Sequence, residues 1–540
     1  MIPSLAQVPV TPTPTPEIAW SLIWPFVVLS LGGVLLITIT SVVPRLRGNG
    51  FPASFTAVTA AIAAATLFNI WDRVNGVEGP QLVVGNAIGV DGFTVFVTLV
   101  ICIAVFFASM LLDDYLRREN LDGPEWYVLL LMSAAGGVLL ASAEDLIVTF
   151  IGLEVLSIAA YVMAALHLRR LDSQEAGFKY FLLGALASAV LLYGIALVYG
   201  ATGSTSLQTI AIAGLVPNEL GISAGSESSM ILVGMAFLLV GFAFKVSAAP
   251  FHFWTPDVYQ GSPTPVVAFM ASGIKVAGFA GMVRVFWVGF GPYFADWRPI
   301  IFGLAIITLI IGSLLALAQR NVKRMLAYSS ITHAGFILVA VYAAASPDGS
   351  GGILGGEAFL FYLFTYTVMV AGTFGVVTVV GGRGDGNHDL DDYRGLSKRQ
   401  PLLALMMAAL LFSQAGVPFT SGFIAKFRVI AAVASEDTAA TYTLAAIAML
   451  TAVVSAVLYL RIVVSMFLVD LPGTASAEAG EEGDEADTEE PLPRLNPALS
   501  AVMAVSLAAF VTILFGLVPD LGGDVLTDAA ESLDAFRLGS

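Results

Sequence analysis

Long runs of apolar residues, separated by short polar stretches, are the dominant pattern of this 540-residue chain. We searched for runs of about 20 residues, the length that a helix needs to cross a bilayer. Fourteen runs lie near residues 18–43, 52–71, 92–112, 126–143, 146–167, 176–200, 229–249, 263–288, 299–318, 325–345, 356–381, 402–433, 440–469 and 498–518. The pattern predicts an all-α polytopic membrane protein with about 14 transmembrane helices.

The composition supports the same class of protein. Hydrophobic residues make up 57% of the chain and charged residues 12%, whereas soluble domains have roughly 45–50% and 25%. The formal net charge of −16 says little about the membrane core, because eight acidic residues lie between positions 478 and 490. We expect residues 470–497 to form a solvated acidic cytoplasmic loop, with docking to a partner as the alternative.

Sequence signals for bound cofactors are not evident. Cys102 is the only cysteine, and one thiol can neither form an internal disulfide nor hold an iron–sulfur cluster by itself. The chain has no nucleotide-binding glycine motif in a strand–turn–helix context and no P-loop. We therefore expect no cofactor, no metal and no nucleic acid on this chain.

The distribution of Lys and Arg residues predicts the orientation in the membrane. With the N-terminus outside, the inner loops hold 14 of the 24 basic residues, and the outer side holds only Arg73, Arg298 and Arg537. The other seven lie within or at the ends of the apolar runs. Because basic residues concentrate in cytoplasmic loops, the N-terminus is predicted to lie outside.

Five ionisable residues are embedded in the apolar runs: Glu154, Lys179, Lys245, Lys275 and Lys426. A charge at the bilayer centre costs at least ~2.5–3.5 kcal/mol, so such residues usually mark a path for ions or protons. The alternatives are packing roles for Lys245 and Lys275, a polar helix end at Lys426 marked by the nearby Arg428, and a purely structural ion pair between Glu154 and Lys179.

Two proline-containing segments indicate an internal duplication. Ser-Ala-Ala-Pro-Phe (247–251) ends the seventh run, and Gln-Ala-Gly-Val-Pro-Phe (414–419) lies inside the twelfth. Proline removes a backbone donor and breaks a helix, so we predict breaks in helices 7 and 12. Five runs separate the two segments, so they cross the membrane in opposite directions, as in inverted-topology repeats. A chance match of two short motifs is the alternative.

The expected organisation follows from these features. Residues 1–125 hold an N-terminal segment and helices 1–3, residues 126–289 the first five-helix repeat, residues 299–469 the second, inverted repeat, residues 470–497 the acidic loop, and residues 498–540 helix 14 and the C-terminal tail.

Four stretches of the chain resemble a known family of membrane subunits. They are DLIVTFIGLEVLSIAAYVMAAL (145–166), EAGFKYFLLGALASAVLLYGIALVYGATGSTSL (175–207), FKVSAAPFHFWTPDVYQGSPTPVVAFMASGIKVAG (244–278) and NVKRMLAYSSITHAGFIL (321–338). They are similar to subunit N of proton-pumping NADH-quinone oxidoreductase (respiratory complex I), an antiporter-like membrane family. The resemblance covers roughly residues 20–518 and is strongest over residues 145–335.

The resemblance implies a proton path. Glu154 resembles the family's paired carboxylate, Lys179 its lysine partner, and Lys245 the central proton-carrying lysine of the first half-channel. A desolvated lysine has a lowered proton affinity and a nearby carboxylate restores it. A shift of that carboxylate's charge is therefore expected to switch Lys245 between holding and releasing a proton.

The same resemblance extends the path across the membrane plane. Lys275, with His252 near the proline break, resembles the relay that leads across the subunit. Lys426 resembles the terminal lysine of the second half-channel, and His333 occupies a position suggestive of a hydrated axis between the two half-channels. A satisfied loop histidine is the alternative for His252, and a packing role is the alternative for His333.

The remaining histidines and two arginines receive no part in this path. His167 and His388 lie near inner loops, where we expect both side chains to be solvated. Arg284 and Arg461 are left without a role.

The implied function is proton translocation coupled to NADH oxidation by quinone. The FMN, iron–sulfur clusters and quinone are expected in partner subunits, and the partners are the other membrane and peripheral subunits of complex I together with the lipid bilayer. The location implied is a bacterial-type cell (inner) membrane. Two rival functions are a subunit of a multi-subunit cation/proton antiporter and a structural membrane scaffold whose lysines only pair helices.

Overall fold

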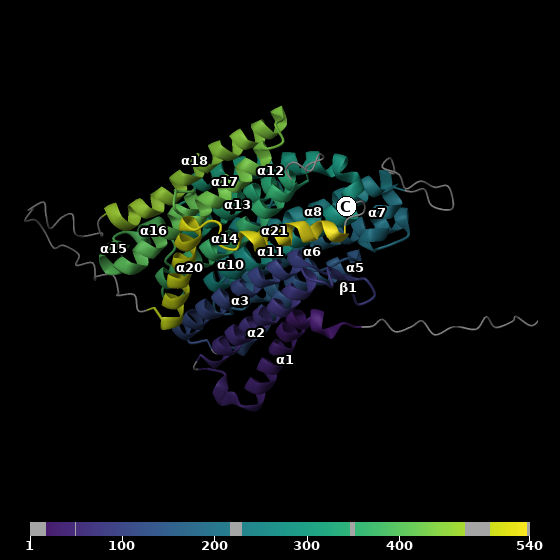
Figure 1. Ribbon diagram of the computed structural model, residues 1–540. Coiled ribbons are helices and arrows are strands. Elements are labelled where there is room, and N and C mark those ends of the chain that lie inside the picture. The colour runs from purple at the N-terminus through teal and green to yellow at the C-terminus, as the bar shows by residue number, and fades with distance from the viewer. Residues whose placement is uncertain are drawn as a thin grey trace, which may run out of the picture.

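The computed structural model of the protein describes residues 18–48, 50–121, 123–215, 229–345, 352–469 and 497–536 (Figure 1). Thirteen of the described helices are long and apolar enough to cross a membrane. The run predicted at 402–433 forms two shorter helices, α16 (Pro401–Ala415) and α17 (Ser421–Ala434). The prediction of an all-α polytopic membrane protein is confirmed. The acidic residues 478–490 lie outside the described part of the chain.

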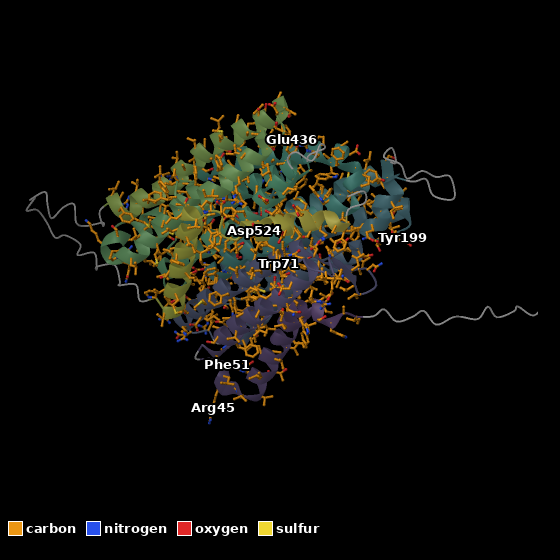
Figure 2. The ribbon with its side chains drawn as sticks, viewed as in Figure 1. Arg45, Phe51, Trp71, Tyr199, Glu436 and Asp524 are labelled. Carbon is orange, nitrogen blue, oxygen red and sulfur yellow. The ribbon has the colours of Figure 1, made fainter. Side chains whose placement is uncertain are left out.

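The N-terminal region holds three long helices and a small hairpin. Its elements are η1 (Trp20–Leu22), α1 (Trp24–Val42), η2 (Pro44–Leu46), α2 (Phe51–Val74), β1 (Gln81–Val83), β2 (Ile88–Val90) and α3 (Gly92–Glu119). The two strands pair antiparallel, with Gln81 opposite Val90. Figure 2 shows Arg45 at the turn between α1 and α2, at the edge of the molecule. The hairpin was not predicted from the apolar runs, because its strands have only three residues each.

The first half of the remaining chain contains five spans and several short helices. Its elements are α4 (Pro124–Ala141), α5 (Leu146–Ala165), α6 (Leu171–Thr202), α7 (Leu207–Leu215), α8 (Ser229–Val246), α9 (Trp254–Gly261), α10 (Thr264–Phe269), η3 (Met270–Ile274), α11 (Lys275–Arg284) and η4 (Val285–Gly289). The last four form one continuous span, in which η3 and η4 are π-helical.

The second half and the C-terminal region follow. Their elements are η5 (Gly291–Tyr293), α12 (Phe294–Leu317), α13 (Val322–Ala344), α14 (Gly352–Val380), η6 (Leu390–Tyr393), α15 (Leu396–Arg399), α16, α17, α18 (Ala439–Leu468), α20 (Leu499–Leu517), α21 (Gly523–Ser532) and η7 (Leu533–Phe536). α21 packs on α14 and α3 (Figure 1).

Polar capping residues mark where several spans begin. Asp91 accepts a hydrogen bond from the backbone of Thr94 (2.7 Å) at the start of α3, and Asp145 accepts one from Ile147 (2.7 Å) at the start of α5. Asn321 accepts one from Arg324 (3.1 Å) at the start of α13. Each cap satisfies a backbone donor that the first helical turn leaves free, so these apolar segments begin at defined residues.

Successive spans define two sides of the molecule. We call the side that carries the β1–β2 hairpin, the α4–α5 junction and α21 the hairpin side. The opposite side carries the α5–α6 connection and residues 381–400, and we call it the loop side. Under the predicted orientation, the hairpin side is outside and the loop side is cytoplasmic.

Burial separates central spans from peripheral ones. The most apolar windows of the Thr264–Gly289 span and of α13 are completely buried, and that of α14 almost completely. Only a third of the corresponding windows of α1, α6 and α18 is buried, so these helices lie at the periphery of the chain. Lys275 and His333 therefore lie on the two completely buried central spans.

The first predicted helix break lies between α8 and α9. α8 ends at Val246 and α9 begins at Trp254, with Pro250 between them. The backbone N–H of Ala249 donates to Thr308 Oγ1 (2.9 Å), and the Trp254 indole donates to the carbonyl of Phe244 (3.0 Å). Backbone groups that the break releases thus bond to protein side chains, as is required inside a membrane.

The second predicted break lies between α16 and α17, around Pro418. Gly416 has φ +90° at the end of α16, a conformation that favours glycine. Lys426 Nζ donates to the carbonyls of Gln414 (2.8 Å) and Ala415 (3.0 Å). Pro250 and Pro418 thus each lie between two described helices, whereas the broken transmembrane helices and the inverted repeats both stay predictions.

Candidate functional site

Lys245 lies in the last turn of α8, directly before the first break, and only 4% of its surface is exposed. Its Nζ donates to Ser157 Oγ on α5 (2.7 Å). The ammonium also lies 5.8 Å from the ring centres of Tyr161 and Tyr180. Glu154 lies on the same helix, one turn before Ser157. A hydroxyl and two aromatic faces thus contact the buried ammonium, which offsets its desolvation.

Lys179 is not the partner of Glu154, so this part of the sequence prediction is wrong. Lys179 Nζ pairs with Glu175 (2.7 Å) and Asp257 (3.5 Å), and 42% of its side chain is exposed. The physical reason is that α6 begins at Leu171 on the loop side, so that Lys179 lies only two turns into the helix. Glu154 Oε1 is buried without a hydrogen-bond partner among the described residues.

Lys275 lies deeper in the molecule, at the start of α11, with 2% of its surface exposed. Its Nζ donates to the backbone carbonyl of Ser330 (2.8 Å) and to Ser330 Oγ. Tyr366 donates to the same Ser330 hydroxyl (2.8 Å), and its ring centre lies 5.9 Å from the ammonium. Lys275 is therefore held by two oxygens of α13 and one aromatic side chain of α14.

His333, on the same helix as Ser330, connects to further hydroxyl groups. Its Nδ1 lies 2.8 Å from the Tyr362 hydroxyl, and its Nε2 lies 3.1 Å from the Tyr459 hydroxyl. Tyr459 also bonds to Ser329 Oγ (2.6 Å), which donates to Gln414 Oε1 (3.5 Å). These contacts form a chain from α13 through α18 to the end of α16.

Lys426 lies at the far end of that chain. It is 6% exposed, and its Nζ donates to the two backbone carbonyls described above, one of which belongs to Gln414. The ammonium lies 5.1 Å from the ring centre of Phe336. Gln414 therefore touches both the hydroxyl chain, through its side chain, and Lys426, through its backbone.

His252 lies in the first break, between α8 and α9. Its ring centre is 6.5 Å from that of Tyr328 on α13. Nδ1 of His252 is buried and has no hydrogen-bond partner among the described residues. The ring thus lies between the first half and α13, with one nitrogen open to a further donor or acceptor.

A buried ionic cluster lies on the loop side of the molecule. Asp385 is fully buried, and its carboxylate pairs with Arg170 (3.0 Å), Lys323 (3.4 Å) and His388 (3.0 Å). Thr264, at the start of α10, donates to it through both its backbone N–H (3.1 Å) and its hydroxyl (2.6 Å). Burial alone would raise the pKa of Asp385, but the charge of Lys323 and the contact with His388 hold that pKa well below its usual range.

The expectation that His167 and His388 are solvated is wrong. Both are at most 3% exposed. His167 Nδ1 lies 2.6 Å from the Tyr115 hydroxyl, and His388 Nε2 contacts Asp385. Burial lowers the pKa of both histidines. Their positions near loops predicted exposure, but these loops fold against α3, α10 and α13 rather than into water.

The comparison with known families decides where the chain belongs. A family model described as "NADH:quinone oxidoreductase/Mrp antiporter, TM" matches residues 143–468. The chain belongs to this family. The matched range covers most of both predicted repeats, and the resemblance inferred from the four sequence stretches is confirmed.

Individual relatives in the family are similar over nearly the whole chain. NADH-quinone oxidoreductase subunit N of Trichlorobacter lovleyi is 38% identical over 501 residues, which cover 93% of this chain and 95% of the relative. The subunit N of Chloroflexus aggregans is 37% identical, with 91% and 93% covered.

Solved structures of the family share the fold. A chain of respiratory complex I from Thermus thermophilus with bound aureothin has a TM-score of 0.73 and 32% identity, covering 93% of this chain and 99% of that one. A chain of the Mrp complex from Dietzia sp. DQ12-45-1b has a TM-score of 0.77 at 21% identity, covering 96% and 98%. The second likeness concerns the fold alone.

Several polar residues of this chain that contribute to the buried contacts were not predicted from the sequence. They contribute hydroxyl or amide groups to the buried contacts: Ser157, Ser329, Ser330, Tyr362, Tyr366, Gln414 and Tyr459. Serine and tyrosine are common in apolar helices and cost little there, so hydropathy does not distinguish them. Gln414 was visible as an amide inside an apolar run. No group of three or more His, Cys, Asp or Glu side chains suited to a metal occurs among the described residues.

Proposed function

We propose that this protein is the proton-translocating membrane subunit N of an NADH:quinone oxidoreductase. The observation that carries the proposal is the series of buried lysines Lys245, Lys275 and Lys426, each held by neutral oxygens or aromatic faces rather than by a fixed ion pair. Such lysines can gain and lose a proton without breaking a salt bridge. The subunit N relatives and the complex I structure support the same assembly.

The residues take different parts in the proposed path. Glu154 supplies a negative charge near Lys245 and thereby stabilises its ammonium form. His252 lies between the first half and α13, and its Nδ1 has no hydrogen-bond partner within the described part of the chain. Lys275 and His333 lie on the central helices, and the hydroxyls of Tyr459 and Ser329 extend the path toward Lys426. Lys179 lies at the loop-side surface, where it can exchange protons with water.

Redox chemistry is assigned to partner subunits. FMN, iron–sulfur clusters and quinone belong, in this proposal, to the other membrane and peripheral subunits of the complex. This chain contributes proton-holding side chains, and the energy for moving protons comes from NADH oxidation by quinone in those partners.

The location and orientation are part of the same proposal. The loop side carries clusters of basic residues, among them Arg169, Arg170, Arg320, Lys323 and Arg324. By the positive-inside rule, this side is cytoplasmic and the N-terminus lies outside a bacterial-type cell membrane. The division into repeats at 126–289 and 299–469 is proposed on the opposite directions of the two broken spans.

Purification of the tagged chain from its native membrane tests the proposal. We expect it to bring down an assembly that oxidises NADH with quinone and, in sealed vesicles free of sodium, generates a proton gradient. A cation/proton antiporter subunit would instead bring down no NADH-oxidising activity, and its proton movement would require a sodium or potassium gradient. That result would replace the proposed function with the antiporter.

A double-mutant cycle tests the assignment of Glu154 to Lys245. Glu154→Gln and Ser157→Ala both act on the Lys245 ammonium, so we expect their effects on pumping rate to be coupled by roughly 0.5–3 kcal/mol. Glu154→Gln and Lys179→Ala share no contact, so their effects should add within about 0.5 kcal/mol. Strong coupling of Glu154 with Lys179 would restore the pairing that the sequence suggested.

A further inference from the structure

A fully buried arginine on the hairpin side holds two carboxylates. Arg284, the last residue of α11, is 0% exposed. Its guanidinium binds Asp91 in a bidentate manner (2.6 and 2.8 Å) and also contacts Glu144 Oε1 (3.2 Å). It further donates to Thr94 Oγ1 (2.6 Å) and to the carbonyl of Ala141 (3.3 Å). One positive charge thus faces two acidic side chains that come from different parts of the chain.

Glu144 is the less satisfied of the two acids. It lies between α4 and α5 with 1% of its surface exposed, and its Oε2 has no hydrogen-bond partner among the described residues. A methyl group at Gly89 would come within 2.8 Å of Glu144 Cγ and 3.0 Å of the Phe536 ring. The carboxyl is therefore enclosed by the hairpin and the C-terminal segment.

The charges around Glu144 favour a bound proton. If both acids are ionised, the cluster carries one excess negative charge away from water, which is costly. Burial raises the pKa of Glu144 to about 7, because the favourable charge of Arg284 is offset by the negative charge of Asp91. The neighbouring Asp145 binds Thr205 (2.6 Å) and its own helix start instead. Arg284 and Asp91 are thus the charged groups that face Glu144 among the described residues.

The position of Arg284 on its helix links this cluster to the proton path. α11 is a ten-residue segment whose first residue is Lys275 and whose last is Arg284. π-helical segments lie on both sides of it, at Met270–Ile274 and Val285–Gly289. Such segments have shifted backbone hydrogen bonds and are frequent at functional sites. α11 is thus bounded on both sides by irregular helical turns.

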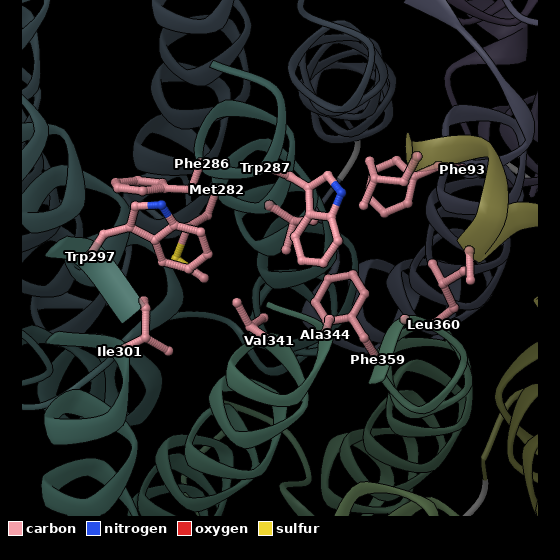
Figure 3. Close-up of a pocket in the computed structure, with 14 residues that line it drawn as sticks. Phe93, Met282, Phe286, Trp287, Trp297, Ile301, Val341, Ala344, Phe359 and Leu360 are labelled. Carbon is pink, nitrogen blue, oxygen red and sulfur yellow. The ribbon is translucent and has the colours of Figure 1, made fainter. Parts of the chain in front are cut away.

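A small apolar cavity lies beside α11. Figure 3 shows Met282, Phe286 and Trp287 on one side of it, facing Val341 and Phe359. Phe93 forms another part of the wall, and its ring centre lies 5.1 Å from the Arg284 guanidinium. The cavity and the cluster therefore share a wall, on the hairpin side of the same helix.

We propose that Glu144 is a proton-binding residue on the hairpin side that positions Lys275 through Arg284 and α11, an inference that rests on the proton path proposed above. With Glu144 protonated, the cluster is neutral and Arg284 stays on Asp91. When Glu144 loses its proton to the hairpin side, its second negative charge attracts Arg284 away from Asp91. The shift passes along α11 and changes the contacts of Lys275 with Ser330.

The raised pKa of Glu144 means that the folded protein binds this proton more tightly than the unfolded chain does. The contribution of protonated Glu144 to stability is therefore present at low pH and is lost as pH rises through about 7. The protonated fraction of a carboxyl with that pKa falls from about nine-tenths at pH 6 to about one-tenth at pH 8. The position of α11 is therefore expected to respond within this interval.

Infrared and hydrogen-exchange measurements on the intact assembly test this inference. Difference spectra between pH 6 and pH 8 should contain a protonated-carboxyl band that is lost in Glu144→Gln and kept in the control Glu357→Gln. Glu357 is a hairpin-side acid that binds only the Thr527 hydroxyl among the described residues (2.7 Å). Amide exchange over residues 275–284, corrected for its intrinsic pH dependence, should differ between the two pH values in the unmodified protein and lose that difference in Glu144→Gln. Glu144→Asp should restore it.

Two outcomes would overturn the inference. One is a carboxyl band that persists unchanged in Glu144→Gln. The other is a lower abundance of the Glu144→Gln assembly with unaltered pH dependence of exchange in α11, as expected of a merely structural contact. Neither measurement depends on pumping, so both remain informative if the lysines prove not to carry protons.

Discussion

Replacing Lys245 with alanine is expected to lower proton pumping by about 100-fold or more while the assembly still forms. A positioned proton-transfer group contributes roughly 10²–10⁴-fold, and a methyl group can neither hold the proton nor bond to Ser157. Quinone reduction that is coupled to pumping should fall with it. The measurement is the initial rate of proton gradient formation in sealed vesicles, normalised to the amount of assembled complex.

Two further variants make this result specific. Lys245→Arg keeps the charge and should also impair pumping, since a guanidinium does not release its proton at accessible pH. Lys179→Ala removes a lysine of the same family motif that is 42% exposed, and its effect should be much smaller. Equal effects of the alanine variants at both positions, or normal pumping by assembled Lys245→Ala, would contradict the central role of Lys245. A scaffold role predicts lower abundance with unchanged pumping per complex.

Replacing Asp385 with alanine is expected to cause the largest loss of stability. The change leaves Lys323 buried without its carboxylate, and breaking a buried pair in this way costs about 3–5 kcal/mol. It also removes the bonds that hold the start of α10 through Thr264. Because the pKa of Asp385 is held well below its usual range, its contribution is present at neutral pH and is lost only under acid conditions. The thermal unfolding midpoint of the purified assembly measures the effect.

Asp391 offers a matched control for this experiment. It lies on the same loop side and pairs with Arg394 (2.8 Å), but 72% of its side chain is exposed. Surface pairs contribute about 0–1 kcal/mol, so Asp391→Ala should leave the unfolding midpoint nearly unchanged. Similar losses in both variants would mean that the buried cluster has no special part in the fold.

Hydropathy was sufficient to predict the all-α membrane class, because long apolar runs have few other structural outcomes. The breaks expected at Pro250 and Pro418 stay predictions. The family resemblance, and not hydropathy, paired Glu154 with Lys179. In the structure Lys179 instead contacts Glu175 and Asp257, near the loop-side start of α6.

The sequence also concealed the ionic clusters at both sides of the molecule. Asp385 and His388 lie in a polar stretch whose sequence is typical of a solvated loop. Only the fold shows that Arg170 and Lys323 pair with Asp385 there. Arg284 had no assigned role because its partners, Asp91 and Glu144, lie 193 and 140 residues away in the chain. Contacts of this range depend on helix packing, which a single sequence does not specify.

The hydroxyl chain between His333 and Lys426 has a consequence for the timing of transport. A hydroxyl that accepts a proton on one side and releases one on the other ends with its own O–H pointing the opposite way. Tyr459 and Ser329 must therefore rotate back before a second proton can follow. Gln414 exchanges no proton through its amide and meets Lys426 only through its backbone carbonyl. In the proposed path, protons would therefore cross this part of the molecule one at a time, with a reset between successive passages, and the last transfer to Lys426 would need a further group or a movement of the lysine.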